Sequence, residues 1–243
     1  MMTTRVSLLV SFLALSACAH AQAQEEQDSA AAQKGEVRDV PDFDGVAVGH
    51  GIKAEVKVGA KSVRLEGPQD LLARIQLKVE DGILVTRVER QGFFDNFNGG
   101  RVYLYVSNPR VKSVSASGGS RIEAEATNTD EFSAEASGGA VVSVRDVDAR
   151  KVEAEASGGA RVTLSGRALE IDAEASGGAV VRALDIKGVK ALEAEASGGS
   201  RVEADASDRV SGDASGGSVI QLVSRPDRSD VETSGGSKVV YKD

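Results

Sequence analysis

Apolar and polar residues alternate one by one along much of the C-terminal half of this chain. Residues 152–156 (VEAEA) are apolar at every second position, and residues 160–164 (ARVTL) repeat the alternation. A period of two places the apolar side chains on one face of a β-strand and the polar ones on the other. Ala and Glu favour helices, but a helix would need apolar residues three and four apart. The pattern therefore predicts half-buried strands.

A repeated Ser-Gly-Gly tripeptide separates these strands. It occurs seven times, at intervals of 18 to 21 residues, and its serines are Ser117, Ser137, Ser157, Ser176, Ser197, Ser215 and Ser234. Glycine adopts the positive φ angles that a sharp corner between strands requires. The predicted corner glycines are Gly118, Gly119, Gly138, Gly139, Gly158, Gly159, Gly177, Gly178, Gly198, Gly199, Gly216, Gly217, Gly235 and Gly236.

Two architectures can join such strands. An antiparallel meander would not need the same residue types at the same offset in each unit, whereas stacked parallel rungs place each residue on its equivalent in the next coil. The sequence therefore predicts an all-β fold, in which residues 113–243 form a parallel β-helix, or β-solenoid, of about seven rungs. Each rung would contain about 20 residues and lie about 4.8 Å from the next.

A second pattern leaves the length of the rung open. The residue four positions after each repeat serine alternates between basic and apolar, in the order Arg121, Val141, Arg161, Val180, Arg201, Val219 and Lys238. Spacing basic side chains two rungs apart limits their repulsion in a 20-residue rung, which is the interpretation we favour. The alternative is a 40-residue rung with two Gly-Gly corners.

Residues 36–112 contain most of the aromatic residues and no Ser-Gly-Gly. Residues 75–85 predict a hairpin closed by an Asp-Gly turn, and Pro68 is placed to start one helical turn. Tyr103 and Tyr105 are two apart and share a face of a strand. Because an open solenoid end exposes strand edges, we expect this region to form a β cap continuous with the first rungs.

One segment of this cap is irregular. Residues 91–100 (QGFFDNFNGG) gather Phe93, Phe94 and Phe97 between two strands. One interpretation folds the phenylalanines back over the end of the core. The other leaves them as an exposed apolar lip for a partner or a membrane surface.

The N-terminus has the pattern of an export signal. Residues 1–17 contain Arg5 followed by a twelve-residue apolar run, which is too short to span a bilayer. The sequence before Cys18 has the form of a bacterial lipobox, which predicts lipidation of Cys18; the alternative is cleavage after residues 19–21 (AHA). Residues 18–35 would then be the lipidated cysteine and a flexible tether. We expect an exported protein, an outer-membrane lipoprotein or otherwise a periplasmic or secreted one.

Composition excludes several classes of function. The net charge of −8 argues against nucleic acid as a partner. One cysteine and two histidines exclude Cys/His zinc sites and an intrachain disulfide. No cofactor motif is found, and His50, between two glycines, is typical of a loop rather than of a catalytic site. After residue 113 the aromatic residues are Phe132 and Tyr241, which argues against an aromatic sugar-binding face there.

Acidic residues recur two positions before the repeat serine. In parallel stacking they would form one exposed acidic stripe, composed of Glu135, Glu155, Glu174, Glu195, Asp213 and Glu232. Neighbouring carboxylates about 4.8 Å apart repel one another, so we expect raised pKa values and weak binding of divalent cations that relieve the repulsion.

The Ser-Gly-Gly repeats, the Asp81-Gly82 turn, Gly51-Ile52 and the ending Ser237-Lys238-Val239-Val240-Tyr241 together resemble the bacterial "putative auto-transporter adhesin, head GIN domain" family. Lys53 stands where the family's naming tripeptide has Asn. The resemblance implies a secreted or lipid-anchored β-helical envelope protein.

Two functions remain open. The first is a non-catalytic, adhesin-like envelope protein that binds a surface polymer or protein, with no catalytic, cofactor or metal residues. The alternative is a polysaccharide lyase or hydrolase on a β-helix scaffold. The repeated carboxylates favour the first, because a glycosidase needs two carboxylates in unlike environments.

Overall fold

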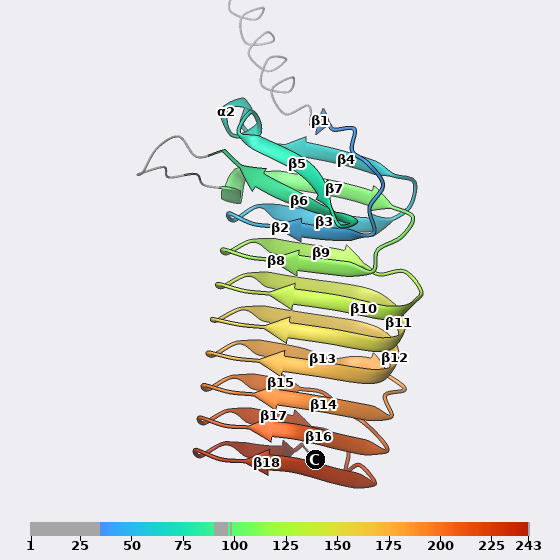
Figure 1. Ribbon diagram of the computed structural model, residues 1–243, viewed down its shortest axis with the longest axis vertical. Helices are drawn as coiled ribbons and strands as arrows, with labels where there is room; N and C mark the ends of the chain where they lie inside the picture. Colours follow the sequence, from blue (N-terminus) through green and yellow to red (C-terminus); the bar gives the residue numbers. More distant parts are fainter. Residues whose placement is uncertain (1–34, 90–96, 98, 243) are drawn as a thin grey trace, which may run out of the picture. The chain divides into compact units, whose positions relative to one another are not determined.

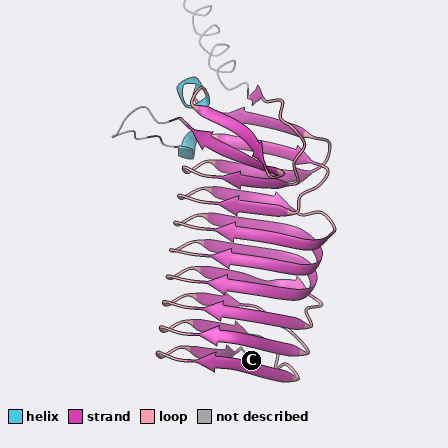
Figure 2. Cartoon of the chain, viewed as in Figure 1, coloured by secondary structure: helices cyan, strands magenta, loops and turns pink. Residues whose placement is uncertain are grey.

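The computed structural model describes residues 35–89, 97 and 99–242, and the unit that begins at Glu36 is built almost wholly from strands (Figure 2). The expected signal segment and Cys18 lie outside the described residues. Helix is limited in this described part to α2 (Gln69–Leu72), which follows Pro68 as predicted, and the 3-10 helix η1 (Gly99–Arg101). Neither has the length or apolar character of a membrane span.

Each coil of the repeat region contains a strand before its Ser-Gly-Gly corner and a strand after it (Figure 1). The strands before the corners form the pre-corner face, which consists of β8 (Ser113–Ala116), β10 (Thr129–Ala136), the second halves of β11 (Val141–Ala156) and β12 (Arg161–Ala175), β14 (Ala191–Ala196), β16 (Arg209–Ala214) and β18 (Arg228–Thr233). The strands after the corners form the post-corner face, which consists of β9 (Arg121–Glu125), the first halves of β11 and β12, β13 (Val180–Lys187), β15 (Arg201–Glu203), β17 (Val219–Leu222) and β19 (Lys238–Tyr241).

Strands on the same face pair in parallel with the strand one repeat away. Glu135 lies opposite Glu155, and Glu155 lies opposite Glu174. The all-β parallel solenoid is therefore confirmed, and its rung is about 20 residues long. Each coil contains one Ser-Gly-Gly corner and one bend at the other end of its strands. The alternative of a 40-residue rung with two Gly-Gly corners is therefore wrong. The alternation of basic and apolar residues therefore spaces like charges along the post-corner face.

The core lies between the two faces and is filled by the inward residues of both. Val152, Ala154 and Ala156 from one face, and Val162 and Leu164 from the other, are almost fully buried. The small size of Ala and Val keeps the two faces close together.

Both glycines of every Ser-Gly-Gly corner have positive φ, but they differ in their surroundings. A Cβ built on Gly138 would lie 3.5 Å from the backbone nitrogen of Gly118, whereas one built on Gly139 would meet nothing within 4 Å. The first glycine therefore stacks on the preceding corner, and the second projects into open space.

Parallel stacking extends into the region expected to form the cap. β2 (Gly45–Val48) and β3 (Lys53–Val58) pair in parallel with β8 and β9. Gly49-His50-Gly51 occupies the corner between them, and His50 has a φ of 61°. This coil lacks the serine of the repeat, which is why the repeat pattern did not reveal it.

The coil that stacks on the other side of β2 and β3 is formed by strands that do not directly follow them in the sequence. β6 (Ile83–Val88) and β7 (Tyr103–Asn108) stack on the other side of β2 and β3 (Figure 1). Antiparallel strands complete this end: β5 (Ile75–Glu80) on β6, β4 (Ser62–Glu66) on β7 and β1 (Glu36–Val37) on β4. The predicted hairpin is confirmed, since Glu80 pairs with Ile83 across the Asp81-Gly82 turn.

Candidate functional site

The six acids of the predicted stripe occupy successive coils of the pre-corner face. Their strands are in register, so that each acid lies opposite the next along the solenoid, in the order Glu135, Glu155, Glu174, Glu195, Asp213 and Glu232. All six side chains are exposed. In the preceding coil the same position is Ser115.

A groove of about 330 Å³ follows this stripe from β8 to β16. Five of the stripe acids line one side, and the corner serines, among them Ser157 and Ser176, line the groove beside them. Hydroxyl and carboxylate groups thus repeat along the groove at the spacing of the coils, about 4.8 Å. A long ligand with its own repeat suits such a surface better than a single compact molecule.

Two acids of the groove, Glu155 and Glu174, have raised pKa values. Partial loss of hydration in the groove is the main cause that raises the pKa of Glu155 and of Glu174. Repulsion from neighbouring carboxylates, Glu135 beside Glu155 and then Glu155 and Glu195 beside Glu174, raises them further. Only the repulsion between carboxylates could be expected from the sequence.

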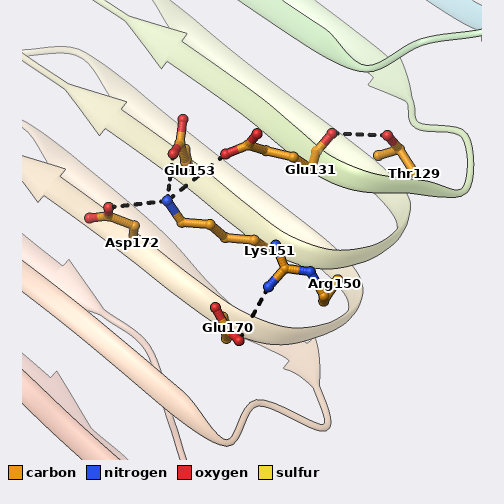
Figure 3. A network of polar contacts seen from close by, with 7 residues as sticks. All are labelled: Thr129, Glu131, Arg150, Lys151, Glu153, Glu170 and Asp172. Carbon is orange, nitrogen blue, oxygen red and sulfur yellow. Dashed lines mark hydrogen bonds and ion pairs between the residues drawn. The ribbon is translucent and has the colours of Figure 1, made fainter.

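A lysine interrupts the acidic surface beside the stripe (Figure 3). Lys151 Nζ lies 2.6 Å from Glu153 Oε1, 3.7 Å from Asp172 Oδ2 and 3.9 Å from Glu131 Oε1. The hydrogen bond with Glu153 raises the pKa of Lys151 and lowers that of Glu153. Lys151 thus compensates Glu131, Glu153 and Asp172, which lie on three successive coils of the pre-corner face. Sequence periodicity gave no sign of it.

The chemistry available in the groove is that of repeated, similar carboxylates. Within the described ranges, no three His, Cys, Asp or Glu side chains come together as a metal-ion site. General acid and base roles require two carboxyl groups whose surroundings separate their pKa values. The pKa values of Glu155 and Glu174 are raised by the same causes, whereas Glu153, whose pKa is lowered, lies outside the lining of the groove. Repeated carboxyl and hydroxyl groups with similar surroundings suit the binding of a ligand along the groove.

The raised pKa values make a prediction about stability and pH. A carboxyl group whose pKa is raised on folding favours the folded state below its unfolded pKa, and this contribution is lost as pH rises through the raised value. The Glu155→Gln/Glu174→Gln variant should therefore be more stable than wild type at pH 7. The gain should be below about 1 kcal/mol, because both side chains are screened by solvent. It should vanish below about pH 4, where both glutamates are protonated. Urea unfolding across this pH range measures it.

The matched control removes two exposed acids outside the stripe, Asp39→Asn/Asp130→Asn. If this control gains as much stability at pH 7 as the stripe variant, the gain comes from net charge and not from the groove.

The two remaining sequence features lie at the other end of the unit. His50 is at a corner, where its ring meets Phe97 edge-on at 6.3 Å. Phe97 packs against the core and lies 5.1 Å from the guanidinium of Arg74. This placement agrees with phenylalanines that fold back on the core; Phe93 and Phe94 lie outside the described residues.

Comparisons with known proteins agree with this architecture. The sequence family described as "Putative auto-transporter adhesin, head GIN domain" matches residues 42–226. No match was found among curated proteins. The fold is similar to that of a putative adhesin from Bacteroides fragilis, with a TM-score of 0.77 at 18% identity, and of a putative lipid binding protein from Parabacteroides distasonis, with a TM-score of 0.64 at 12% identity. A putative adhesin from Parabacteroides merdae has a TM-score of 0.58 at 14% identity. Each alignment covers 86% of this chain and 96% of the other.

Proposed function

We propose, from the premise that this chain belongs to the auto-transporter adhesin head GIN domain family, that it is a non-catalytic, adhesin-like protein of the cell envelope. Its role would be to bind a surface polymer or an envelope protein along the pre-corner face. The observation that carries the proposal is the groove in which carboxylates and serines repeat from coil to coil. Such a surface is matched to a partner that also repeats.

The proposed location follows from the N-terminal sequence. Residues 1–17 would direct export and the lipobox would place a lipid on Cys18, with residues 18–35 as the tether. An outer-membrane lipoprotein is the location we propose, and a periplasmic or secreted protein is the alternative. In the Cys18→Ala variant we expect loss of lipoprotein processing and of membrane fractionation. Unchanged processing and fractionation of this variant would contradict the anchor.

The partner is proposed from charge. An acidic groove attracts cationic groups directly, and it binds anionic envelope polymers through divalent cations that bridge two sets of carboxylates. The alternative function, a lyase or hydrolase, would need carboxyl groups in unlike environments, and the described groove offers similar ones.

The experiment is capture from an envelope extract on the immobilised full-length chain, with and without millimolar calcium at matched ionic strength. We expect polymer or protein capture by wild type that falls at least severalfold in Glu155→Gln/Glu174→Gln/Glu195→Gln. The matched control, Glu80→Gln/Asp130→Asn/Asp205→Asn, removes three acids elsewhere and should bind like wild type. Equal capture by both variants would show that the groove is not the binding surface.

A further inference from the structure

A second groove, of about 180 Å³, lies where β3 and β7 continue the post-corner face beyond β9. The register of these strands arranges its outward side chains in two rows of three. The first row contains Tyr103, Lys53 and Arg121, and the second contains Tyr105, Glu55 and Glu123. Strands that are far apart in the sequence therefore bring aromatic, cationic and anionic side chains together in one groove.

The aromatic element is a pair of tyrosines on one side of the groove. Their ring planes differ by 14° and their centroids are 6.4 Å apart. Lys53 Nζ lies 5.1 Å from the Tyr103 centroid, and Arg64 Cζ lies 4.6 Å from the Tyr105 centroid. Tyr103 is 41% exposed, so this pair is not explained by core packing.

The charged elements are segregated rather than paired. Lys53 lies directly beside Arg121, and Glu55 directly beside Glu123, and like charges opposite one another in a sheet are unfavourable. Glu55 is compensated by Lys57, 2.6 Å away. In the part of the chain that the structure describes, the side chains of Arg121 and Glu123 have no hydrogen-bond or ion-pair partner.

We propose that this groove binds a small zwitterionic group, with its phosphate or carboxylate end on Arg121 and Lys53 and its ammonium end on Glu123 and Glu55, beside Tyr105. Arg and Lys recognise phosphate and carboxylate, and a tyrosine ring beside a carboxylate attracts an ammonium group. The two rows are two residues apart on each strand, about 6.6 Å, which suits the two charged ends of phosphocholine or phosphoethanolamine. The two glutamates would repel a dianion, and Lys53 and Arg121 would repel a dication. A neutral sugar would leave the charges of both rows uncompensated.

Tyrosine fluorescence of the full-length chain tests this directly. The chain has no tryptophan and three tyrosines, two of which line the groove. Titration with phosphocholine and with phosphoethanolamine should give a saturable change, at least tenfold tighter than with choline or inorganic phosphate alone. Arg121→Gln and Glu123→Gln should each weaken binding about tenfold, the effect of losing a charged contact. Both side chains are exposed, so thermal unfolding should stay unchanged.

The matched controls are Arg161→Gln, in the same row of the post-corner face, and Glu193→Gln, on the other face; both should bind like wild type. Sedimentation with phosphatidylcholine or phosphatidylethanolamine vesicles assigns the bound group to a lipid, and binding of the free compounds alone assigns it to a soluble or polymer-borne group. A response to lactose equal to that with the zwitterions, or no saturable response to either zwitterion, would overturn the proposal. This test does not depend on the acidic groove, so its failure leaves the proposed function standing.

Discussion

Replacing Gly212 with alanine is expected to destabilise the protein by about 3 to 5 kcal/mol. Gly212 lies in β16 opposite Ala194 of the neighbouring coil, and its φ is 134°. A Cβ at this position would overlap the carbonyl oxygen of Ala194 and approach its carbonyl carbon to 2.8 Å. Both atoms are backbone atoms held in the parallel ladder, so they cannot move aside without breaking strand pairing. The free-energy costs of the backbone strain and of the steric overlap therefore add.

Urea unfolding of the variant measures this cost, and Gly139→Ala is the matched control. Gly139 also has positive φ, 81°, but a Cβ there would meet nothing within 4 Å. The free energy of unfolding of the control should fall only by the cost of a left-handed alanine, about 1 to 2 kcal/mol. Equal losses in the two variants would show that the close approach between coils does not matter.

Replacing Phe132 with alanine is expected to cost about 3 to 5 kcal/mol. The side chain is fully buried in β10 and faces the core between the two sheets. Its equivalents in the following coils are the aliphatic residues Val152, Ile171 and Leu192. Removing the ring would leave a cavity among small side chains attached to rigid coils, which can collapse only partly.

The same unfolding measurement on Phe132→Leu provides the comparison. Leucine restores most of the volume and matches Leu192, the residue found three coils later, so a loss below about 1.5 kcal/mol is expected. A loss below 1.5 kcal/mol in Phe132→Ala as well would mean that the coils close around the missing ring, and that the core is not rigidly packed.

Much of the fold could be predicted because a parallel solenoid repeats the same environment at the same offset. The corner glycines and the acidic stripe are consequences of this repetition, and so both could be read from local sequence. The coil formed by β2 and β3 could not, because Gly49-His50-Gly51 lacks the serine of the repeat. The stacking of β6 and β7 outside that coil is a pairing of distant segments that no local pattern encodes.

The same limit explains what was missed at the two grooves. The contact of Lys151 with Asp172 depends on which side chains meet between coils, and alternation alone does not specify it. Aromatic residues after residue 113 are few, which argued against an aromatic surface on the solenoid. Strand β7 nevertheless brings Tyr103 and Tyr105 onto the post-corner face from the region before it.

Binding of an envelope polymer without cleavage distinguishes the proposed adhesin-like protein from a polysaccharide lyase or hydrolase. Purified full-length protein is incubated with envelope polysaccharides, and the bound fraction and the release of reducing ends or unsaturated sugars are followed in the same samples. We predict retention of the polymer on the protein with no release above the protein-free sample. Release that disappears when a single carboxylate, such as that of Glu155 or Glu174, is replaced by its amide would contradict the claim and identify an enzyme.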